Sequence, residues 1–169
     1  GMRKKAKYDP NAEKPFLHPG RQALIKYEDT VIGYLGEVHP DVADNYNIGT
    51  RVYVAVLDMP SIVEKATFDR KYEGIAKFPA VTRDISMVLP KEILVGQVEE
   101  IIVTRGGKIL ENYELFDIYE GSQIKEGFKS VAYSLSFRAK DHTLTDTEIT
   151  SAMKKILDGL KALGAELRQ

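Results

Sequence analysis

The second half of the chain alternates between two spacings of hydrophobic residues, one typical of strands and one typical of helices. Residues 83–89 alternate apolar and polar side chains, which is the period of a strand with one buried face. Residues 113–119 and 130–138 alternate in the same way and are joined by a loop that contains glycine, so they predict a long hairpin. Residues 165–168 predict a last short strand.

Two helical patterns separate these strands. Residues 93–104 place apolar side chains three and four positions apart, and Gly106-Gly107 follows as a helix stop. The second helix begins at Thr145, which forms a T-x-x-E capping box with Glu148. Its apolar face consists of Ile149, Met153, Ile156, Leu157, Leu160 and Leu163. The order strand, helix, strand, strand, helix, strand predicts a two-layer ferredoxin-like βαββαβ domain, of the α+β class.

The first half of the chain has a weaker pattern, which predicts a separate domain of strands and short helices, also of the α+β class. Strands are predicted at 30–38 and 51–57, and short helices at 20–27, 41–46 and 60–68, after an irregular lead-in at 3–20. The periodicity is lost between residues 72 and 81. We therefore assign residues 1–75 to one domain and residues 76–169 to the other.

A ferredoxin-like sheet has one face without helices, and alternation predicts which side chains lie there. On the strand at 113–119, Phe116 and Ile118 take the core positions, so Leu115, Asp117 and Tyr119 are expected to point outward. On the next strand the core positions are Val131, Tyr133, Leu135 and Phe137, and the outward positions are Ser130, Ala132, Ser134, Ser136 and Arg138. A small, polar face with one aromatic ring suits single-stranded RNA. Any solvated sheet face is also small and polar, so both interpretations stay open.

Composition excludes several classes of protein. The chain has 24 Lys and Arg against 25 Asp and Glu, a formal net charge of −1, so a nucleic-acid contact must be local rather than driven by overall charge. It has no cysteine, which rules out disulfides and thiolate metal sites and suits the cytoplasm. No apolar run approaches 18 residues, so a membrane is not an expected partner. Gly1 precedes Met2, and we expect the sequence to be a segment of a longer protein.

The residue types of known active sites do not come together in the sequence. His18, His39 and His142 are far apart, and none has a metal-ligand neighbour at helical or strand spacing. No Ser–His–Asp set, H-E-x-x-H zinc motif or dinucleotide fingerprint can be assembled. Gly106-Gly107-Lys108 follows a helix, whereas phosphate sites use a helix N-terminus, so a helix stop is the favoured interpretation.

Five short motifs connect the second half of the chain to a known family. They are K-F-P-A-V with R-D-I-S at 77–86, L-F-D-I-Y-E-G at 115–121, K-S-V-A at 129–132, T-L-T-D at 143–146 and G-A-E-L-R at 164–168. In this order they resemble the ferredoxin-fold anticodon-binding domain. Upstream, H-P-G-R at 18–21 and G-E-V-H-P at 36–40 resemble the end of the module that precedes this domain in β subunits of bacterial phenylalanine–tRNA ligases.

The resemblance implies that the chain belongs to an assembly of two kinds of subunit, only one of which carries out catalysis. In that family the preceding module is similar to a class II synthetase core but lacks its chemistry, and this chain has no G-x-G-x-E-R motif for ATP. The active enzyme is an (αβ)₂ heterotetramer that binds ATP, magnesium and phenylalanine in its α subunit. We therefore expect no catalytic residue, cofactor or metal in this chain. Its expected partners are phenylalanine tRNA and the α subunit, and not DNA.

The resemblance also implies which residues contact the tRNA anticodon. Tyr119 would stack on a base, while Asp117 and Ser130 would bond base edges. Ala132 and Ser134 would let the RNA approach closely. Arg138 and Arg83 are weaker candidates, either for phosphate contact or for salt bridges to Asp84 or Asp117.

Two other functions are compatible with a ferredoxin-like domain. One is a regulatory module that binds a small molecule such as an amino acid, because this fold often does so at dimer interfaces. The other is a small hydrolase similar to acylphosphatase. That enzyme would need an arginine in a phosphate-binding turn at a helix N-terminus, and residues 90–94 contain no arginine.

Overall fold

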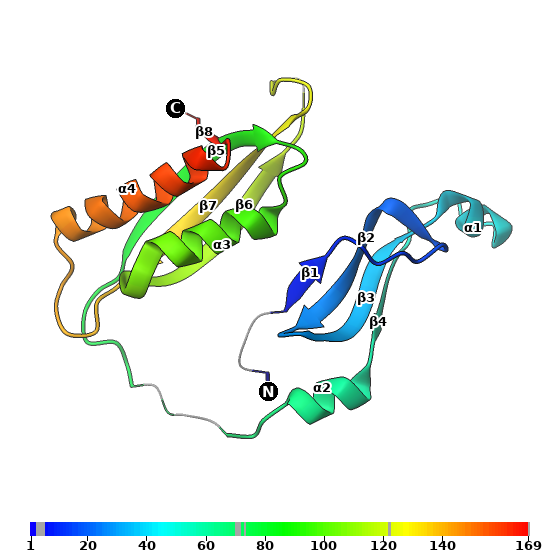
Figure 1. Ribbon diagram of the computed structural model, residues 1–169, viewed down its shortest axis with the longest axis horizontal. Helices are drawn as coiled ribbons and strands as arrows, with labels where there is room; N and C mark the ends of the chain where they lie inside the picture. The colour runs from blue at the N-terminus through cyan, green and yellow to red at the C-terminus, as the bar shows by residue number, and fades with distance from the viewer. Residues whose placement is uncertain (3–5, 70–71, 73, 122, 169) are drawn as a thin grey trace. The chain divides into compact units, whose positions relative to one another are not determined.

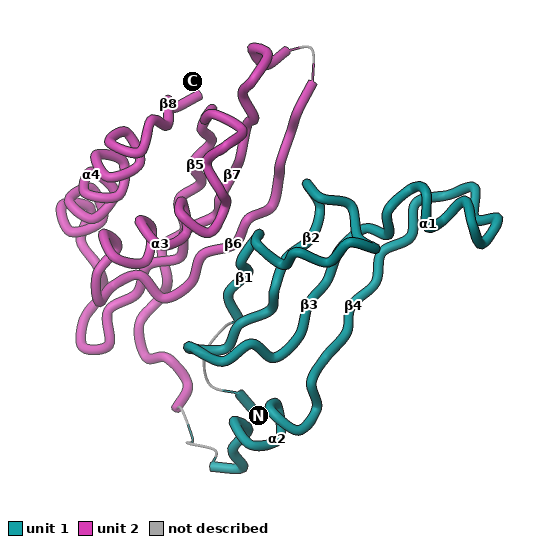
Figure 2. Tube along the Cα trace, turned by 45° about the vertical axis from the view of Figure 1, so that its right-hand side comes forward, with its two compact units in different colours: residues 1–72 teal, residues 73–169 magenta. Residues whose placement is uncertain are grey.

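The computed structural model describes residues 1–2, 6–69, 72, 74–121 and 123–168. The chain divides into two compact units, unit 1 with residues 1–72 and unit 2 with residues 73–169 (Figure 2). Each unit has its own antiparallel sheet of four strands.

Unit 1 is a meander of four strands with two short helices. Its strands are β1 (Lys7–Asp9), β2 (Leu17–Tyr27), β3 (Thr30–Val38) and β4 (Tyr53–Leu57), and its helices are α1 (Pro40–Asn45) and α2 (Met59–Lys65). The strands lie in the order β1-β2-β3-β4, each antiparallel to the next (Figure 1). This confirms the strand predicted at 30–38, most of the strand predicted at 51–57, and the helices predicted at 41–46 and 60–68, although the last begins at Met59 and ends at Lys65.

The helix predicted at 20–27 is wrong, because these residues belong to β2. A helix this short is marginal by itself, whereas β2 has a partner strand on each side, β1 and β3. The irregular lead-in is wrong in part for the same reason, since β1 pairs Lys7 with Lys26. Residues 3–5 of that lead-in lie outside the described residues.

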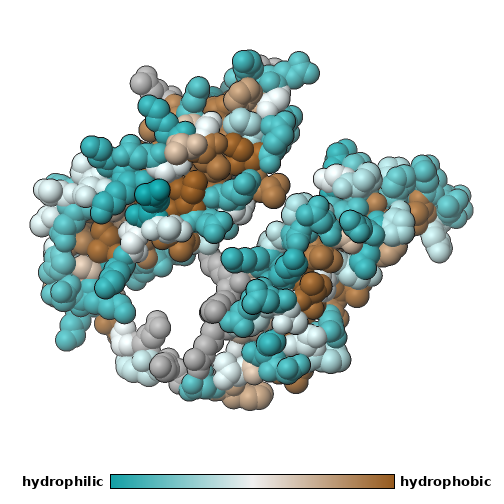
Figure 3. Space-filling model, in the orientation of Figure 1, coloured by the Kyte–Doolittle hydropathy of each residue, from teal (hydrophilic) through white to brown (hydrophobic). Residues whose placement is uncertain are grey.

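Unit 1 has a small core and several exposed apolar side chains. Ile25, Tyr27 and Ile32 form its buried cluster. On β4, by contrast, Tyr53 and Leu57 are 66% and 51% exposed. Figure 3 shows mostly hydrophilic side chains on the visible face of the chain, with hydrophobic ones gathered in patches on both units.

Unit 2 is the predicted ferredoxin-like domain. Its elements are β5 (Val81–Pro90), α3 (Val95–Gly106), the 3-10 turn η1 (Gly107–Ile109), β6 (Leu110–Tyr119), β7 (Phe128–Phe137), α4 (Asp146–Ala162) and β8 (Glu166–Leu167). The strands lie in the order β6-β7-β5-β8, all antiparallel. Helices α3 and α4 lie side by side on one face of this sheet (Figure 1), so the other face has no helical layer.

The core of unit 2 lies between the sheet and the two helices. The core positions predicted along β5 and β7 are confirmed, with these side chains fully or almost fully buried: Ile85, Met87, Leu89, Val131, Tyr133, Leu135 and Phe137. The helices contribute Val98, Ile102, Ile149, Ile156 and Leu160 to the same cluster. Leu94, an apolar position of the helix predicted at 93–104, precedes α3 and is 44% exposed instead of packing on the core. Its N–H donates to Gln97 Oε1 at 2.8 Å, which caps the helix start.

The predicted helix ends are confirmed. Thr145 Oγ1 accepts the Glu148 N–H, and the Glu148 carboxylate accepts the Thr145 N–H at 2.9 Å, so the capping box is closed. Gly107, with φ of 67°, ends α3, and Gly164, with φ of 99°, follows α4. Both angles lie in the left-handed region that favours glycine.

Candidate nucleic-acid interface

A β-bulge in β6 decides which of its side chains reach the face of the sheet without helices, called the open face below. Leu115 pairs with Tyr133, and Asp117 pairs with Ala132, so Phe116 is an extra residue between them. Leu115 accordingly packs on the core, and Phe116 is 56% exposed. The expectations that Leu115 points outward and that Phe116 takes a core position are therefore wrong, because they assumed uninterrupted alternation.

Beyond the bulge, Asp117 and Tyr119 lie on the open face. Asp117 is opposite Ala132 and Tyr119 is opposite Ser130, and residues directly opposite each other share a face. Both β6 side chains are exposed, Tyr119 by 37%. One acceptor and one aromatic ring are thus available on the same strand, two residues apart.

The small residues of β7 are less accessible than expected. Ser130 and Ala132 lie on the open face but are only 4% and 7% exposed, while Ser134 is half-buried. Strand β7 is flanked by β6 and β5, and the larger side chains of Tyr119 and Val88 stand on either side of Ser130. Ser130, Ala132 and Ser134 have short side chains, so the side chains of the neighbouring strands β5 and β6 project further from the open face than they do.

The open face carries several carboxylates. Ser134 lies between Asp84 on β5 and Glu114 on β6, so these two acids share the face with Asp117. Straight alternation assigns Glu114 to the helix side, which is why it was missed. Carboxylates repel phosphate and accept hydrogen bonds from N–H groups, so this face suits base edges better than an RNA backbone.

The two arginines proposed from the sequence do not join this group. Arg83 is opposite Leu135, on the helix side of the sheet, and its Nη1 donates to the Thr82 carbonyl at 3.0 Å. The sequence already indicated this position, because Arg83 is two residues from Ile85 on the same strand and therefore shares its face. Among the described residues, neither Arg83 nor Asp84 forms an ion pair.

Arg138 is occupied within unit 2. Its Nε lies 2.9 Å from the Glu111 carboxylate, and its Nη1 donates to the Phe78 carbonyl at 2.6 Å. A different cation lies on the open face. The Arg168 N–H donates to the Ser86 carbonyl at 2.9 Å and extends the pairing of β8, in which Glu166 is opposite Val88. Arg168, the final residue of the G-A-E-L-R motif, is therefore a better candidate than Arg83 or Arg138 for a positive charge on the open face.

The histidines serve local structure. His18 Nδ1 accepts the Gly20 N–H at 3.1 Å, and His39 Nδ1 accepts the Asp41 N–H at 3.3 Å at the start of α1. Both contacts lie next to a proline, the first within β2 and the second at the start of α1.

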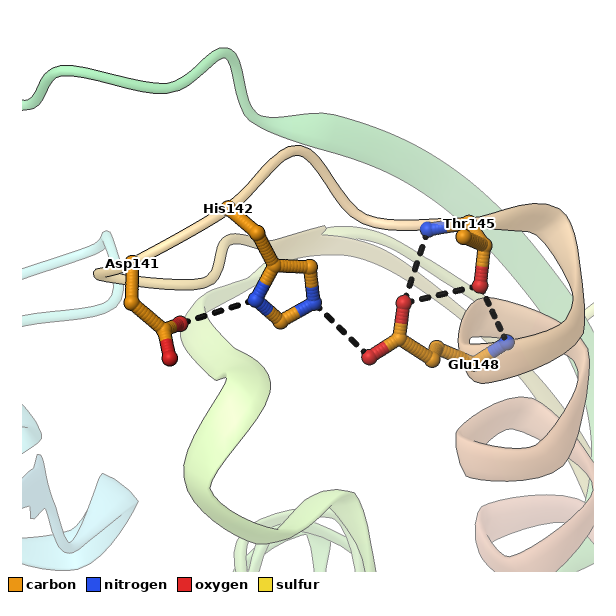
Figure 4. Close-up of polar contacts among 4 residues, drawn as sticks. All are labelled: Asp141, His142, Thr145 and Glu148. Carbon is orange, nitrogen blue, oxygen red and sulfur yellow. Dashed lines mark hydrogen bonds and ion pairs between the residues drawn. The ribbon is translucent and has the colours of Figure 1, made fainter.

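His142 takes part in a polar network at the start of α4, which sequence reasoning did not anticipate (Figure 4). Its ring nitrogens lie 2.8 Å from Asp141 Oδ1 and 2.9 Å from Glu148 Oε1. Glu148 raises the pKa of His142, and Asp141 raises it further. Hydrogen bonds from the Thr145 backbone and hydroxyl, with one from His142, lower the pKa of Glu148 to about 2. The network extends the capping box.

Within the described ranges, no group of three or more His, Asp and Glu side chains is arranged to hold a metal ion. No helix in the part of the chain that the structure describes is long and apolar enough to cross a membrane.

Comparison with known proteins identifies both units. The family model of the ferredoxin-fold anticodon binding domain matches residues 76–168, and that of the phenylalanyl tRNA synthetase beta chain CLM domain matches residues 1–59. Proteins named phenylalanine–tRNA ligase beta subunit are similar over nearly the whole chain. Those of Clostridium acetobutylicum and Clostridium tetani are each 46% identical over 97% of this chain and 21% of their own length. That of Symbiobacterium thermophilum is 41% identical over 96% of this chain and 18% of its own.

The chain thus spans about a fifth of the length of these relatives. The family model covers more than half of the chain, and the strand order of unit 2 is the one that this fold requires. The chain therefore belongs to the family of ferredoxin-fold anticodon binding domains.

Proposed function

We propose that this chain is the part of a phenylalanine–tRNA ligase β subunit that binds phenylalanine tRNA at its anticodon. The observation that supports this proposal most directly is that Tyr119 and Asp117 are exposed together on the open face of a sheet whose other face is covered by helices. The family of unit 2 and the names of its relatives support the same function.

The open face distinguishes bases from backbone. An unpaired base stacks on the ring of Tyr119, and Asp117 accepts a hydrogen bond from a base N–H. The nearby carboxylates of Asp84 and Glu114 disfavour phosphate in the middle of the sheet, so the RNA backbone runs along its edges. The short side chains of Ser130 and Ala132, with Ser134 next to them along β7, leave room for flat bases on the open face.

In this proposal the aminoacylation reaction takes place outside this chain. The chain supplies no catalytic group and holds the tRNA for aminoacylation by the α subunit, which binds ATP, magnesium and phenylalanine. The two kinds of subunit form an (αβ)₂ heterotetramer in the cytoplasm. Arg138, which is engaged by Glu111 and Phe78, keeps a structural part, and Arg83 lies on the other side of the sheet.

A titration with the anticodon stem-loop of phenylalanine tRNA tests the proposal. We expect Tyr119→Ala to weaken binding by about 1–3 kcal/mol through loss of stacking, and Asp117→Asn to weaken it by removing the charged acceptor. Tyr46→Ala, at a tyrosine that is 74% exposed in unit 1, is the matched control. Equal affinity of Tyr119→Ala and the parent chain would rule out the stacking surface.

The salt dependence of the affinity and a titration with free phenylalanine add two further measurements to this test. The face has few cations, so we expect the affinity to fall only shallowly between two salt concentrations. Calorimetry with free phenylalanine should show no heat of binding to this chain. Saturable phenylalanine binding would instead favour a regulatory module.

A further inference from the structure

A hollow of about 290 Å³ lies at the end of the open face where β6 and β7 are joined. It is lined by Lys91, Glu120, Gly121, Ile124, Lys125, Glu126 and Phe128. The phenol of Tyr119 lies against Gly121, since a Cβ added to Gly121 would be 2.5 Å from Tyr119 Cζ. The hollow therefore begins where the proposed stacking surface ends.

Phe128 presents an aromatic ring at this hollow. It has the same parity along β7 as Ser130 and pairs with Pro90 of β5, so it belongs to the open face. It is half-buried, and it is not among the described side chains that pack on the core of unit 2. Lys125 Nζ lies 5.4 Å from the centre of its ring. One face of the ring is thus reached by an exposed lysine side chain rather than by the core.

The charges around the hollow differ from those on the rest of the open face. Glu120 is neutralised by Lys91 at 2.9 Å, and this ion pair lowers the pKa of the Glu120 carboxyl. Lys129 donates to the Lys91 carbonyl at 3.1 Å. Lys125 and Lys129 form no ion pair with a carboxylate among the described residues. Glu126 also lines the hollow, so Glu120 and Glu126 are set against three lysines, Lys91, Lys125 and Lys129. A phosphate is therefore better tolerated here than in the middle of the open face, where Asp84, Glu114 and Asp117 lie together.

We propose that this hollow binds one more unpaired nucleotide, next to the nucleotide that stacks on Tyr119. Its base stacks on Phe128 in place of the Lys125 ammonium, and Lys125 moves to a phosphate oxygen. The volume lies near the lower limit of small-ligand pockets, roughly 300–1,000 Å³, which suits one base. This inference rests on the proposed RNA function and adds Phe128 and Lys125 to the binding residues.

Fluorescence of 2-aminopurine tests the inference with the full 169-residue chain. The probe replaces one base at a time in the loop of the anticodon stem-loop, and stacking quenches it. We expect two adjacent positions to be quenched on binding. Tyr119→Ala should restore the signal at one position, and Phe128→Leu should restore it at the other.

Affinities provide a second readout. Phe128→Leu should weaken binding roughly five- to hundredfold, the equivalent of one stacked base. Lys125→Ala should weaken it and lower the slope of log affinity against log salt by about one. Phe68→Leu, at a fully exposed phenylalanine of unit 1, and Lys154→Ala, on the exposed side of α4, are the matched controls.

The outcomes separate the two proposals. If the parent chain binds no RNA, both fall. If binding depends on Tyr119 but is unchanged by Phe128→Leu and Lys125→Ala, the hollow is excluded and the anticodon proposal stands. If Phe128→Leu does not fold, Lys125→Ala decides, because its exposed side chain can be removed without disturbing the core.

Discussion

The ring of Tyr119 occupies the space that a side chain at Gly121 would need. A Cβ on Gly121 would be 2.5 Å from Tyr119 Cζ, 3.1 Å from Cε1, and closest to the hydroxyl oxygen. Contacts this short would force the ring to shift, so the ring can lie where it does only while residue 121 has no Cβ. The E-G pair that follows Tyr119 in the motif is thus a condition for the orientation of the tyrosine.

Gly121→Ala should move the Tyr119 ring and weaken binding of the anticodon stem-loop towards the level of Tyr119→Ala. The ring signals of Tyr119 in NMR spectra should shift in the free protein. Gly96→Ala, at a glycine of α3 with no atom near its added Cβ, should change neither measurement. RNA affinity and ring signals unchanged in Gly121→Ala would refute the positioning role.

Arg138→Ala should lower the free energy of unfolding of unit 2 by about 1–2 kcal/mol. It removes a partly exposed ion pair, worth little, and a charged hydrogen bond to the Phe78 carbonyl, worth more. Urea denaturation measures the effect, with Lys140→Ala as an exposed control. Under conditions where the variant is folded, its RNA affinity should equal that of the parent chain. A selective loss of RNA affinity would show that Arg138 contacts phosphate after all.

The His142 network should make unit 2 most stable between about pH 4.5 and 6.5. The folded state raises the pKa of His142, so its contribution is complete below the ordinary value of 6.5 and is lost as pH rises through the raised pKa. The pKa of Glu148 is lowered from 4.5 to about 2, so its contribution is present above pH 4.5 and is lost as pH falls towards 2.

Thermal unfolding followed by circular dichroism across this pH range checks the expectation. His142→Gln should remove the decline on the alkaline side, because the substituted side chain does not titrate. It should leave most of the decline on the acid side, since Glu148 still accepts hydrogen bonds from Thr145. Identical pH profiles for His142→Gln and the parent chain would argue against the network.

Tyr133→Phe should leave unit 2 as stable or raise its free energy of unfolding by about 1 kcal/mol. The Tyr133 side chain is completely buried, and its hydroxyl has no hydrogen-bond partner among the described residues. Burial also raises the pKa of this phenol. A buried hydroxyl without a partner costs free energy that phenylalanine does not. Urea denaturation should detect the gain, and a loss above 1 kcal/mol would reveal a partner for the hydroxyl.

Thr145→Ala should lower the free energy of unfolding of unit 2 by about 1 kcal/mol, the usual effect of losing an N-cap. The variant keeps the Thr145 backbone N–H that bonds Glu148 but loses the hydroxyl that accepts the Glu148 N–H. Thr145→Ser keeps that hydroxyl and should restore most of the stability. Equal losses in both variants would assign the effect to packing instead.

Local signals made much of unit 2 predictable. The capping box at Thr145, the glycine stops after α3 and α4, and the buried alternation along β7 depend on residues close together in sequence, and the structure confirms them. The strand β2 was not predictable in this way. Its residues adopt a strand because β1 and β3 pair with its two edges, and neither partner is visible from the local pattern.

The order of strands and helices, and hence the fold of unit 2, was determined by the sequence alone, since periodicity and caps act over a few residues. Only the tertiary structure decided which side chains share the open face. The bulge at Phe116 arises from the register between β6 and β7, and the burial of Ser130 and Ala132 arises from their larger neighbours across the sheet. Register and cross-strand neighbours depend on contacts between distant residues, which alternation within one strand does not contain.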